Sequence, residues 1–351
     1  MIDRRHFVGG AAALLAAHAA AAGPPSRFAT IVDAVAREHA FNGIVAHAYN
    51  GRRDYLATFG HADVEARTPI TAATRFAFGS ASKWLTSVAI LRLVEQRRLD
   101  LDRPITTYLP AFRADTGARL TLRGLLSNTS GLADAVSAAV KRDPSIRAST
   151  EGTAPILARY AGDNLAFTPG TAWEYSFLNW IIVNAILERV SGLPFAAALD
   201  RLVFAPLGMR GAGLVDTLGG RRADTACAYA TLVPPVRKMA GVPPFGAASG
   251  NVFASVDDAI RAAHGIFAGS LLSRGSLAAL TTVVWAPEDY ALGGRVRDVA
   301  GHRWAWETGK IDGYRALIAH QLDSDRTIVV FNNSDMAQAP IARLAEAMIA
   351  A

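Results

Sequence analysis

Apolar residues at helical spacing and in strict alternation divide the chain into elements before any motif is considered. Residues 24–40 read as a first helix, because apolar side chains recur there on one helical face. Those side chains are Phe28, Ile31, Val32 and Val35. The following segment, GIVAHAYNGRRDYLATFGHAD, has two strand-like runs joined at Asn50-Gly51, a dipeptide that strongly favours a tight β-hairpin.

A second amphipathic helix is expected to open at Ser80, after the segment TPITAATRFAFG. Its predicted buried stripe consists of Trp84, Val88, Leu91 and Val94. The residues predicted to face water are Arg92, Glu95, Gln96, Arg97 and Arg98. Such a division between one apolar stripe and one charged face is typical of a helix at the surface of a globular protein.

The end of the chain repeats the hairpin-and-helix pattern. RALIAHQLDSDRTIVVFNN predicts a hairpin that turns at residues 323–325, and Pro340 suits the first turn of a closing helix. The apolar face of that helix is formed by Ile341, Leu344, Ala345 and Met348. We therefore expect an α+β fold: an antiparallel sheet built from both chain ends (about 24–100 and 246–351), flanked by helices, with a largely helical insertion (about 101–245).

Composition and charge narrow the class of protein. With 351 residues, 51% hydrophobic and 19% charged, the chain can bury a large core in one domain or two interlocked ones. Thirty-two of the 36 basic residues are arginine, and they are scattered although the net charge is +6. A nucleic-acid-binding protein more often carries a basic run or a recognisable module, so we expect no nucleic-acid partner.

The first 23 residues, MIDRRHFVGGAAALLAAHAAAAG, have the pattern of a twin-arginine export signal. Arg4 and Arg5 precede an apolar stretch that is too short and too alanine-rich for a good membrane anchor. The alternative is an ordinary first helix. The export reading places the mature protein, residues 24–351, in the periplasm or outside the cell, without stable membrane insertion. Its single cysteine, Cys227, cannot form an internal disulfide.

Ser80 and Lys83 are the first candidate for chemistry. Residues three apart on a helix share a face, so both side chains point the same way. The start of a helix favours a developing negative charge, and a serine needs a base before it becomes a good nucleophile. A lysine in apolar surroundings loses proton affinity and can serve as that base. The alternative is a helix-capping serine with a solvated lysine, and the pair alone does not decide between them.

Five segments of the chain resemble segments of a known family in the same order. This ordered match favours the catalytic interpretation of Ser80 and Lys83. FGSASKW resembles the nucleophile box of the serine β-lactamase-like superfamily, which includes class C β-lactamases, family VIII carboxylesterases, D-amino-acid peptidases and penicillin-binding proteins. LRGLLSNTSGL resembles its LLTHTSGL segment, with Asn128 replacing the histidine. The other matching segments are FTPGTAWEYS (167–176), AASGNVFASVDDAIR (247–261) and WETGKIDGYRALIAHQLDSDRTIVVFNN (306–333). The resemblance covers about residues 25–350 and implies a β-lactamase/transpeptidase-like fold.

The resemblance also implies roles for residues distant in sequence from Ser80. Tyr175 matches the tyrosine that passes a proton between serine and leaving group, although it could be only a core or rim tyrosine. The backbone N–H of Lys310 matches the group that joins the N–H of Ser80 in an oxyanion hole. The third box, Glu307-Thr308-Gly309, is expected to line the cleft and contact substrate.

Two residues depart from the family pattern. Phe177 replaces the asparagine that binds the substrate amide and touches the lysine, and Asn179 is a candidate to reach the site by another route. Glu307 replaces the lysine or histidine that attracts a substrate carboxylate. It could pair with Lys83 or Arg315, or select a cationic or neutral substrate. Both changes argue against efficient β-lactam hydrolysis.

We therefore expect an exported serine hydrolase that cleaves an ester, small amide or peptide through an acyl-enzyme on Ser80. The alternative is a weakly active or inactive relative that binds peptidoglycan fragments or a protein partner. No cofactor is expected, and the histidines outside the signal show no metal-ligand spacing. Those histidines are His39, His47, His61, His264, His302 and His320. Oligomeric state and the natural substrate are left open.

Overall fold

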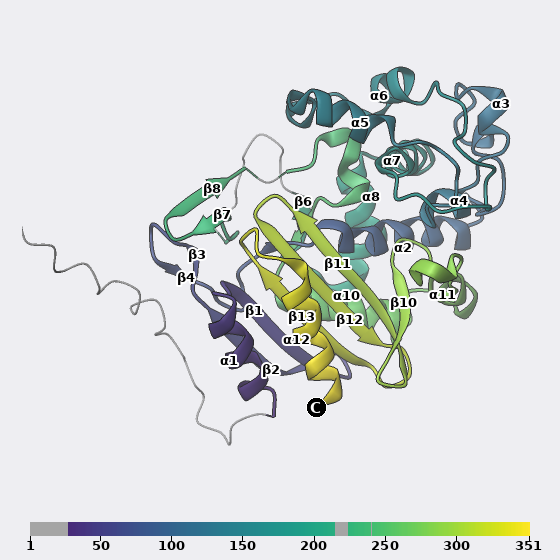
Figure 1. The fold of residues 1–351 in the computed structure, drawn as a ribbon. Helices are drawn as coiled ribbons and strands as arrows, with labels where there is room; N and C mark the ends of the chain where they lie inside the picture. The colour runs from purple at the N-terminus through teal and green to yellow at the C-terminus, as the bar shows by residue number, and fades with distance from the viewer. Residues whose placement is uncertain (1–26, 215–223, 240) are drawn as a thin grey trace, which may run out of the picture.

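A six-stranded antiparallel sheet forms the centre of the computed structural model, which describes residues 27–214, 224–239 and 241–351 (Figure 1). The strand order is β10-β11-β12-β13-β1-β2. The strands are β1 (Gly43–Tyr49), β2 (Arg52–Phe59), β10 (Arg295–Val299), β11 (His302–Ile311), β12 (Tyr314–Gln321) and β13 (Arg326–Asn332). Both ends of the chain thus contribute strands, and the predicted α+β fold class is confirmed.

The two predicted hairpins form where the turn residues indicated. Asn50 and Gly51 adopt φ values of 49° and 67°, the left-handed pair that a two-residue hairpin turn requires. Asp325 has a φ of 54° at the end of the second turn, between β12 and β13. In each case a short polar side chain or glycine tolerates a conformation that most residues avoid.

The two faces of the sheet are covered by different helices because side chains alternate along each strand. Ile44 and Ala46 on β1 join the larger core, while Val45 between them joins the smaller one. The smaller core lies under α1 (Ala29–Glu38) and α12 (Gln338–Ala350), which lie along one face of the sheet in Figure 1. The predicted terminal helices are therefore both present, each with its apolar stripe against the sheet.

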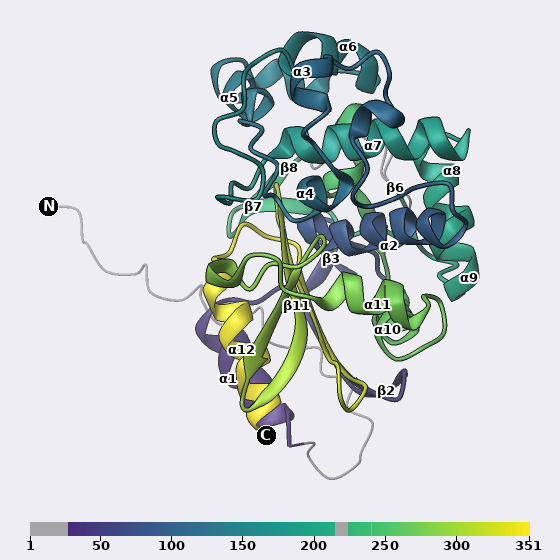
Figure 2. The ribbon, with the colours of Figure 1, turned by 90° about the vertical axis from the view of Figure 1, so that its right-hand side faces the viewer.

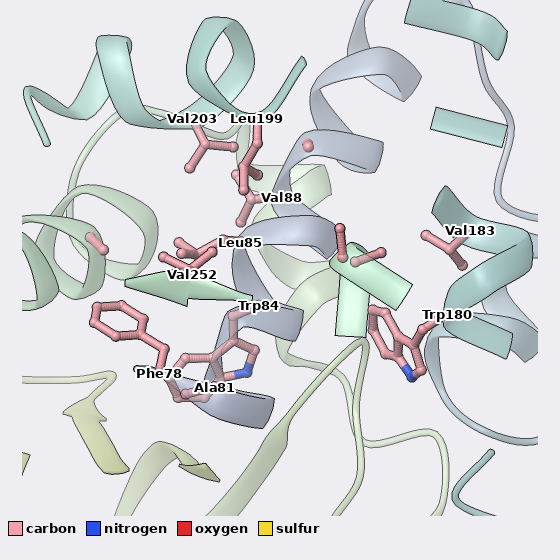
Figure 3. Packing of buried hydrophobic residues seen from close by; sticks show 14 of the residues in the cluster. Phe78, Ala81, Trp84, Leu85, Val88, Trp180, Val183, Leu199, Val203 and Val252 are labelled. Atoms are coloured by element: carbon pink, nitrogen blue, oxygen red, sulfur yellow. The ribbon is translucent and has the colours of Figure 1, made fainter. Parts of the chain in front are cut away.

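Helix α2 (Ser82–Glu95) differs from the sequence expectation, because it is buried on all sides from Ser82 to Leu91. It lies between the sheet and the helical part of the molecule (Figure 2). Leu85 and Val88 lie near Leu199 and Val203 of the neighbouring helical segment (Figure 3). The predicted single stripe was wrong because two layers cover this helix. Arg92, predicted to face water, is partly buried and donates to the Leu271 carbonyl at 3.1 Å.

The chain between α2 and α10 (Val256–Phe267) is mainly helical but also carries short strands. Its helices are α3 (Ala114–Gly117), α4 (Leu122–Leu126), α5 (Ala135–Arg142), α6 (Thr153–Tyr160), α7 (Phe177–Ser191), α8 (Phe195–Leu199) and α9 (Ala205–Leu207). Its strands are β6 (Gly213–Leu214), β7 (Ala228–Leu232), β8 (Pro235–Lys238) and β9 (Val252–Ala254). In Figure 2, α3 to α7 gather above α2, and the large sheet lies below it.

The remaining elements complete the sheet part. They are β3 (His61–Asp63), β4 (Thr68–Pro69), β5 (Phe76–Ala77) and α11 (Arg274–Thr281). The proposed export signal, residues 1–23, lies outside the residues that the structure describes. Within the described ranges no single helix has the length and apolar composition of a membrane span; the bent pair Phe177–Ser191 and Phe195–Leu207 meets those two criteria together.

Candidate active site

Ser80 is presented by a tight turn between β5 and α2. A 3-10 turn (η1, Gly79–Ala81) precedes the α-helix, so the helix begins slightly later than its predicted start at Ser80. Gly79 has a φ of 52°, and a Cβ there would lie 2.8 Å from the backbone nitrogen of Lys310. Only glycine satisfies both the left-handed backbone and this close approach. The glycine therefore brings Ser80 next to the third-box strand.

Lys83 lies one helical turn after Ser80 and points at it, as the spacing predicted. The lysine ammonium donates to the Ser80 Oγ at 3.1 Å and to the backbone carbonyl of Ser249 at 2.5 Å. Its side chain is only 2% exposed. A buried lysine needs acceptors, and these two oxygens supply them.

Two aromatic rings complete the surroundings of the lysine. The Lys83 Nζ lies 5.0 Å from the ring centroid of Tyr175 and 5.2 Å from that of Trp180. Aromatic faces attract a cation at such distances. The asparagine that touches the lysine in the family is absent here, and Trp180 together with the Ser249 carbonyl surrounds the amine instead.

Tyr175 reaches Ser80 from the loop between α6 and α7. Its hydroxyl lies 2.6 Å from the Ser80 Oγ, and its side chain is 40% exposed. Backbone bonds on both sides fix the loop: Glu174 donates its N–H to the Asn128 carbonyl at 3.0 Å, and Phe177 donates to the Asp134 carboxylate at 2.8 Å. The structure thus brings Ser80, Lys83 and Tyr175 together, as the sequence motifs indicated.

The backbone N–H of Lys310 lies on the edge of β11 that faces away from β12, next to Gly79. Ile311 pairs with Tyr314 around a two-residue turn, and residues that flank such a turn exchange both hydrogen bonds. The next pair, Lys310 with Arg315, is then a non-hydrogen-bonded pair whose N–H groups face away from each other. The first-turn N–H of Ser80 has no partner within its own helix. Gly79 thus brings the two backbone groups into one region of the cleft, and their pairing as an oxyanion hole stays a prediction.

Glu307 does not line the cleft, which corrects the expectation that it binds substrate. Its side chain is 2% exposed, and its Oε1 lies 3.4 Å from the Arg295 guanidinium. Arg315, one of its expected partners, pairs with Asp335 at 3.1 Å instead. Burial raises the pKa of Glu307 to about 7, although the positive charges of Arg295 and Lys83 act in the opposite direction. Lys83, the other expected partner, acts on Glu307 through its charge and forms no hydrogen bond or ion pair with it.

Thr308 and Gly309 lie just outside the cleft lining, which reaches β11 at Lys310 and Ile311. A Cβ on Gly309 would overlap the carbonyl oxygen of Phe78, so this glycine serves close packing rather than substrate contact. Of this segment, the described lining of the cleft thus includes Lys310 and Ile311, but not Glu307, Thr308 or Gly309.

Phe177 and Asn179 take different positions. Phe177 lines the cleft, and its ring packs 6.0 Å from that of Phe245. Asn179 is fully buried, accepts from the Ser130 hydroxyl at 2.7 Å and donates to the Asn128 side chain at 3.2 Å. The expected route of Asn179 to the substrate is therefore wrong. It turns inward because α7 presents residues two apart on different faces.

The cleft has a volume of about 800 Å³. Its polar lining comprises Ser80, Lys83, Asp134, Ser137, Lys141, Arg142, Glu174, Tyr175, Ser249 and Lys310. Its apolar lining includes Ala138, Phe177, Trp180, Val242 and Ile311. The sequence did not identify Trp180, Lys141 or Arg142 as lining residues, because they lie outside the matching segments; Ser249 lies in the segment 247–261, which was matched without a role for this residue. No group of His, Cys, Asp and Glu suited to a metal occurs among the described residues.

The sequence model of the Beta-lactamase family matches residues 28–350, so the chain belongs to the beta-lactamase family, as its five segments indicated. The esterase EstB of Burkholderia gladioli is 38% identical over 208 residues, which are 56% of this chain and 53% of EstB. A D-aminopeptidase of Cereibacter sphaeroides is 28% identical over 317 residues, 88% of this chain and 60% of that protein. The chain therefore aligns with little more than half the length of these relatives.

Solved structures agree with the fold. A penicillin-binding protein from Bacillus halodurans superposes with a TM-score of 0.80 at 23% identity, covering 92% of this chain and 99% of that one. The D-amino acid amidase from Ochrobactrum anthropi SV3 superposes with a TM-score of 0.76 at 21% identity, covering 92% and 98%. At these identities the two structures establish the shared fold alone.

Proposed function

We propose that this protein is a serine hydrolase that cleaves an ester or small amide through an acyl-enzyme on Ser80. The observation that carries the proposal is the convergence of three side chains. The Ser80 Oγ lies 2.6 Å from the Tyr175 hydroxyl and 3.1 Å from the Lys83 Nζ. A nucleophile within hydrogen-bonding reach of two proton-handling groups is the arrangement that covalent acyl transfer requires. EstB and the D-aminopeptidase support the same class of substrate by their names.

The reaction follows from the geometry. The Ser80 Oγ attacks the substrate carbonyl and forms a C–O bond, while its proton passes to the Tyr175–Lys83 pair. The N–H groups of Ser80 and Lys310 hold the oxyanion of the tetrahedral intermediate. Collapse of the intermediate breaks the bond to the leaving group, which takes the proton from the same pair. Water then repeats the sequence on the acyl-enzyme and frees the acid.

The lining of the cleft favours simple esters and small amides over β-lactams. A β-lactam presents both an amide side chain and a carboxylate next to the reacting ring. Phe177 supplies an aromatic ring where the family has an amide-binding asparagine. Glu307 supplies no cation to the carboxylate position and is buried against Arg295. The groups that would bind the amide and the carboxylate of a β-lactam are therefore both absent from the positions where the family has them.

Steady-state kinetics test the proposal. The protein without residues 1–23 is assayed with 4-nitrophenyl butyrate, with a D-alanine 4-nitroanilide and with the β-lactam nitrocefin, beside the Ser80→Ala variant. We expect turnover of the ester or anilide that disappears in Ser80→Ala, with nitrocefin the poorest substrate. Nitrocefin turnover comparable to ester turnover contradicts the substrate assignment. Absence of any turnover favours the alternative, an inactive relative that binds peptidoglycan fragments or a partner protein.

We also propose that residues 1–23 direct the protein out of the cytoplasm. The twin arginines, Arg4 and Arg5, and the short apolar stretch after them are the features that support export. Expressed in a bacterium with a twin-arginine pathway, the full chain is expected in the periplasmic fraction, shortened at its N-terminus. Replacement of both arginines by lysine should retain it in the cytoplasm. Equal distribution of the two proteins would contradict the assignment.

A further inference from the structure

Lysine is rare in this chain, and most of the lysines lie in one place. The sequence has four lysines against 32 arginines, and three of the four line the active-site cleft. They are Lys83, Lys141 and Lys310. Lys83 belongs to the reaction centre. Lys141 and Lys310, together with Arg142, are exposed and add positive charge to the cleft beyond it.

Other cationic side chains near the cleft form ion pairs. The side chains of Lys141, Arg142 and Lys310 form none within the described part of the chain. Arg147 pairs with Asp312 at 2.9 Å, and Lys238 pairs with Asp335 at 2.6 Å. No hydrogen bond or ion pair joins the side chains of Lys141, Arg142 or Lys310 to another described residue. These charges therefore remain free for a ligand.

The three cations stand on two facing walls of the cleft. Lys141 and Arg142 end helix α5, and Lys310 is near the end of strand β11. The Arg147–Asp312 ion pair joins the segment after α5 to the turn after β11, so the two walls approach each other there. An anion between the walls can thus contact cations from both sides.

The carboxylates of the cleft lie toward the reaction centre. Asp134 caps the start of α5 and accepts N–H bonds from Ser137 and Phe177, and Glu174 precedes Tyr175 in the chain. Lys141 is seven residues beyond Asp134, so their Cα atoms are about 10 Å apart along the helix. Along α5 the acidic group thus lies toward the reaction centre and Lys141 and Arg142 lie farther along, while Lys310 adds its charge from the opposite wall.

We propose that this cleft selects esters or amides that carry an anionic group, a carboxylate or phosphate, several bonds away from the scissile carbonyl. The inference rests on the proposed hydrolase function and adds the substrate class. The uncharged stretch between the anion and the carbonyl lies against Ala138, Phe177 and Ile311, which supply an apolar surface. Glu307 does not repel such a substrate, because it is buried outside the cleft.

Matched esters test this selection. The 4-nitrophenyl monoester of adipic acid is compared with 4-nitrophenyl hexanoate, which has the same acyl length without the carboxylate. An anion in the leaving group is probed with 4-carboxyphenyl hexanoate against its 4-carbamoylphenyl analogue. Each kcat/KM is divided by the spontaneous hydrolysis rate of that ester. We expect the anionic member of one pair to be preferred by about 10-fold, and raising the salt from about 20 mM to about 500 mM to reduce that preference.

Three variants assign the preference to its residues. Lys141→Gln/Arg142→Gln and Lys310→Gln should each lower the anionic-to-neutral ratio by about 3-fold or more, and Lys141→Glu/Arg142→Glu should invert it. Arg189→Gln is the matched control, because Arg189 is an exposed arginine at the end of α7 outside the cleft. It tests whether any cation at a helix C-terminus has the same effect. The anionic-to-neutral ratio of this variant should equal that of the wild type.

The outcomes separate the two proposals. A wild-type protein that hydrolyses both members of each pair equally overturns the anion selection and leaves the hydrolase intact. A preference that persists in all three cleft variants, or that Arg189→Gln also removes, overturns the residue assignment. Failure to hydrolyse any of the four esters overturns the hydrolase proposal and this inference with it.

Discussion

The Tyr175 hydroxyl and the Ser80 Oγ lie 2.6 Å apart although 95 residues separate them in the chain. Ser80 lies in the turn that leads into α2, the helix next to the sheet, and Tyr175 comes from the helical part above it. The hydrogen bond therefore joins the two parts of the molecule at the point where the chemistry is proposed. A proton can move between the nucleophile and the tyrosine without any rearrangement of the backbone.

Replacement of Tyr175 by phenylalanine removes this proton path. General acid–base groups contribute about 10²–10⁴-fold, so kcat on the best ester should fall by about that factor with little change in KM. The ring and its contact with Lys83 remain, so folding should be preserved, which circular dichroism and thermal unfolding can verify. A kcat within a factor of about three of the wild type would show that Lys83 alone handles the proton.

Gly309 offers a test of the oxyanion hole through the backbone. In Gly309→Ala the added methyl group overlaps the Phe78 carbonyl oxygen, so β11 must move away from the turn that carries Ser80. Loss of one oxyanion donor costs about 10²–10³-fold in kcat, and a loss approaching that size is expected. Gly162→Ala is the control, because nothing lies within 4 Å of a Cβ at Gly162. Equal activity of both variants would remove the Lys310 N–H from the mechanism.

Phe177 tests the link between this position and the kind of bond cleaved. Phe177→Asn restores the amide that the family uses to bind an amide side chain, and we expect the ratio of nitrocefin to ester turnover to rise by about 10-fold. Phe177→Leu removes the ring without adding an amide and should not raise that ratio. Loss of the ring leaves space beside Phe245, so both variants should be less stable by about 1–3 kcal/mol. A rise in both variants would assign the effect to space alone.

Glu307 predicts a dependence of stability on pH. Burial raises the pKa of Glu307 to about 7, above its ordinary value of 4.5. Between these values the folded protein binds more protons than the unfolded chain, so this group's stabilising contribution is full below pH 4.5 and is lost as the pH rises through 7. Glu307→Gln cannot titrate. Its free energy of unfolding, relative to the wild type, should rise by up to about 3 kcal/mol between pH 4.5 and pH 8.

Urea unfolding of both proteins at several pH values measures this difference. The comparison with Glu307→Gln is needed because other groups titrate in the same range. Burial lowers the pKa of His320 to about 3, which makes the folded protein gain stability as the pH rises toward 6.5 and so opposes Glu307. A difference between the two proteins that stays constant with pH would mean that Glu307 is not the buried titrating group that the structure places beside Arg295.

Features encoded by neighbouring residues could be predicted from the sequence. The Asn50-Gly51 hairpin follows from two residues that tolerate positive φ, and the common face of Ser80 and Lys83 follows from helical spacing. Tyr175 and the Lys310 backbone could be placed only through the ordered family segments, because no local rule relates them to Ser80. The hairpin and the Ser80–Lys83 pair were thus predicted from local residues, and Tyr175 and Lys310 from their motifs.

Features that depend on packing between distant segments could not be predicted. The pairing of Glu307 with Arg295 rather than Arg315 depends on the register between β10 and β11. The inward turn of Asn179 depends on Asn128 and Ser130 from another segment. The full burial of α2 depends on the helical part that covers it. The apolar periodicity of α2 alone does not indicate that covering layer.

A covalent label tests the central claim, that Ser80 is the nucleophile, most directly. The protein without residues 1–23 and its Ser80→Ala variant are incubated with a fluorophosphonate, and their intact masses are measured. We predict the addition of one phosphonyl group to the wild type, located on Ser80 by peptide mapping, and none to Ser80→Ala. An unmodified wild type, or an equal adduct on Ser80→Ala, would contradict the account.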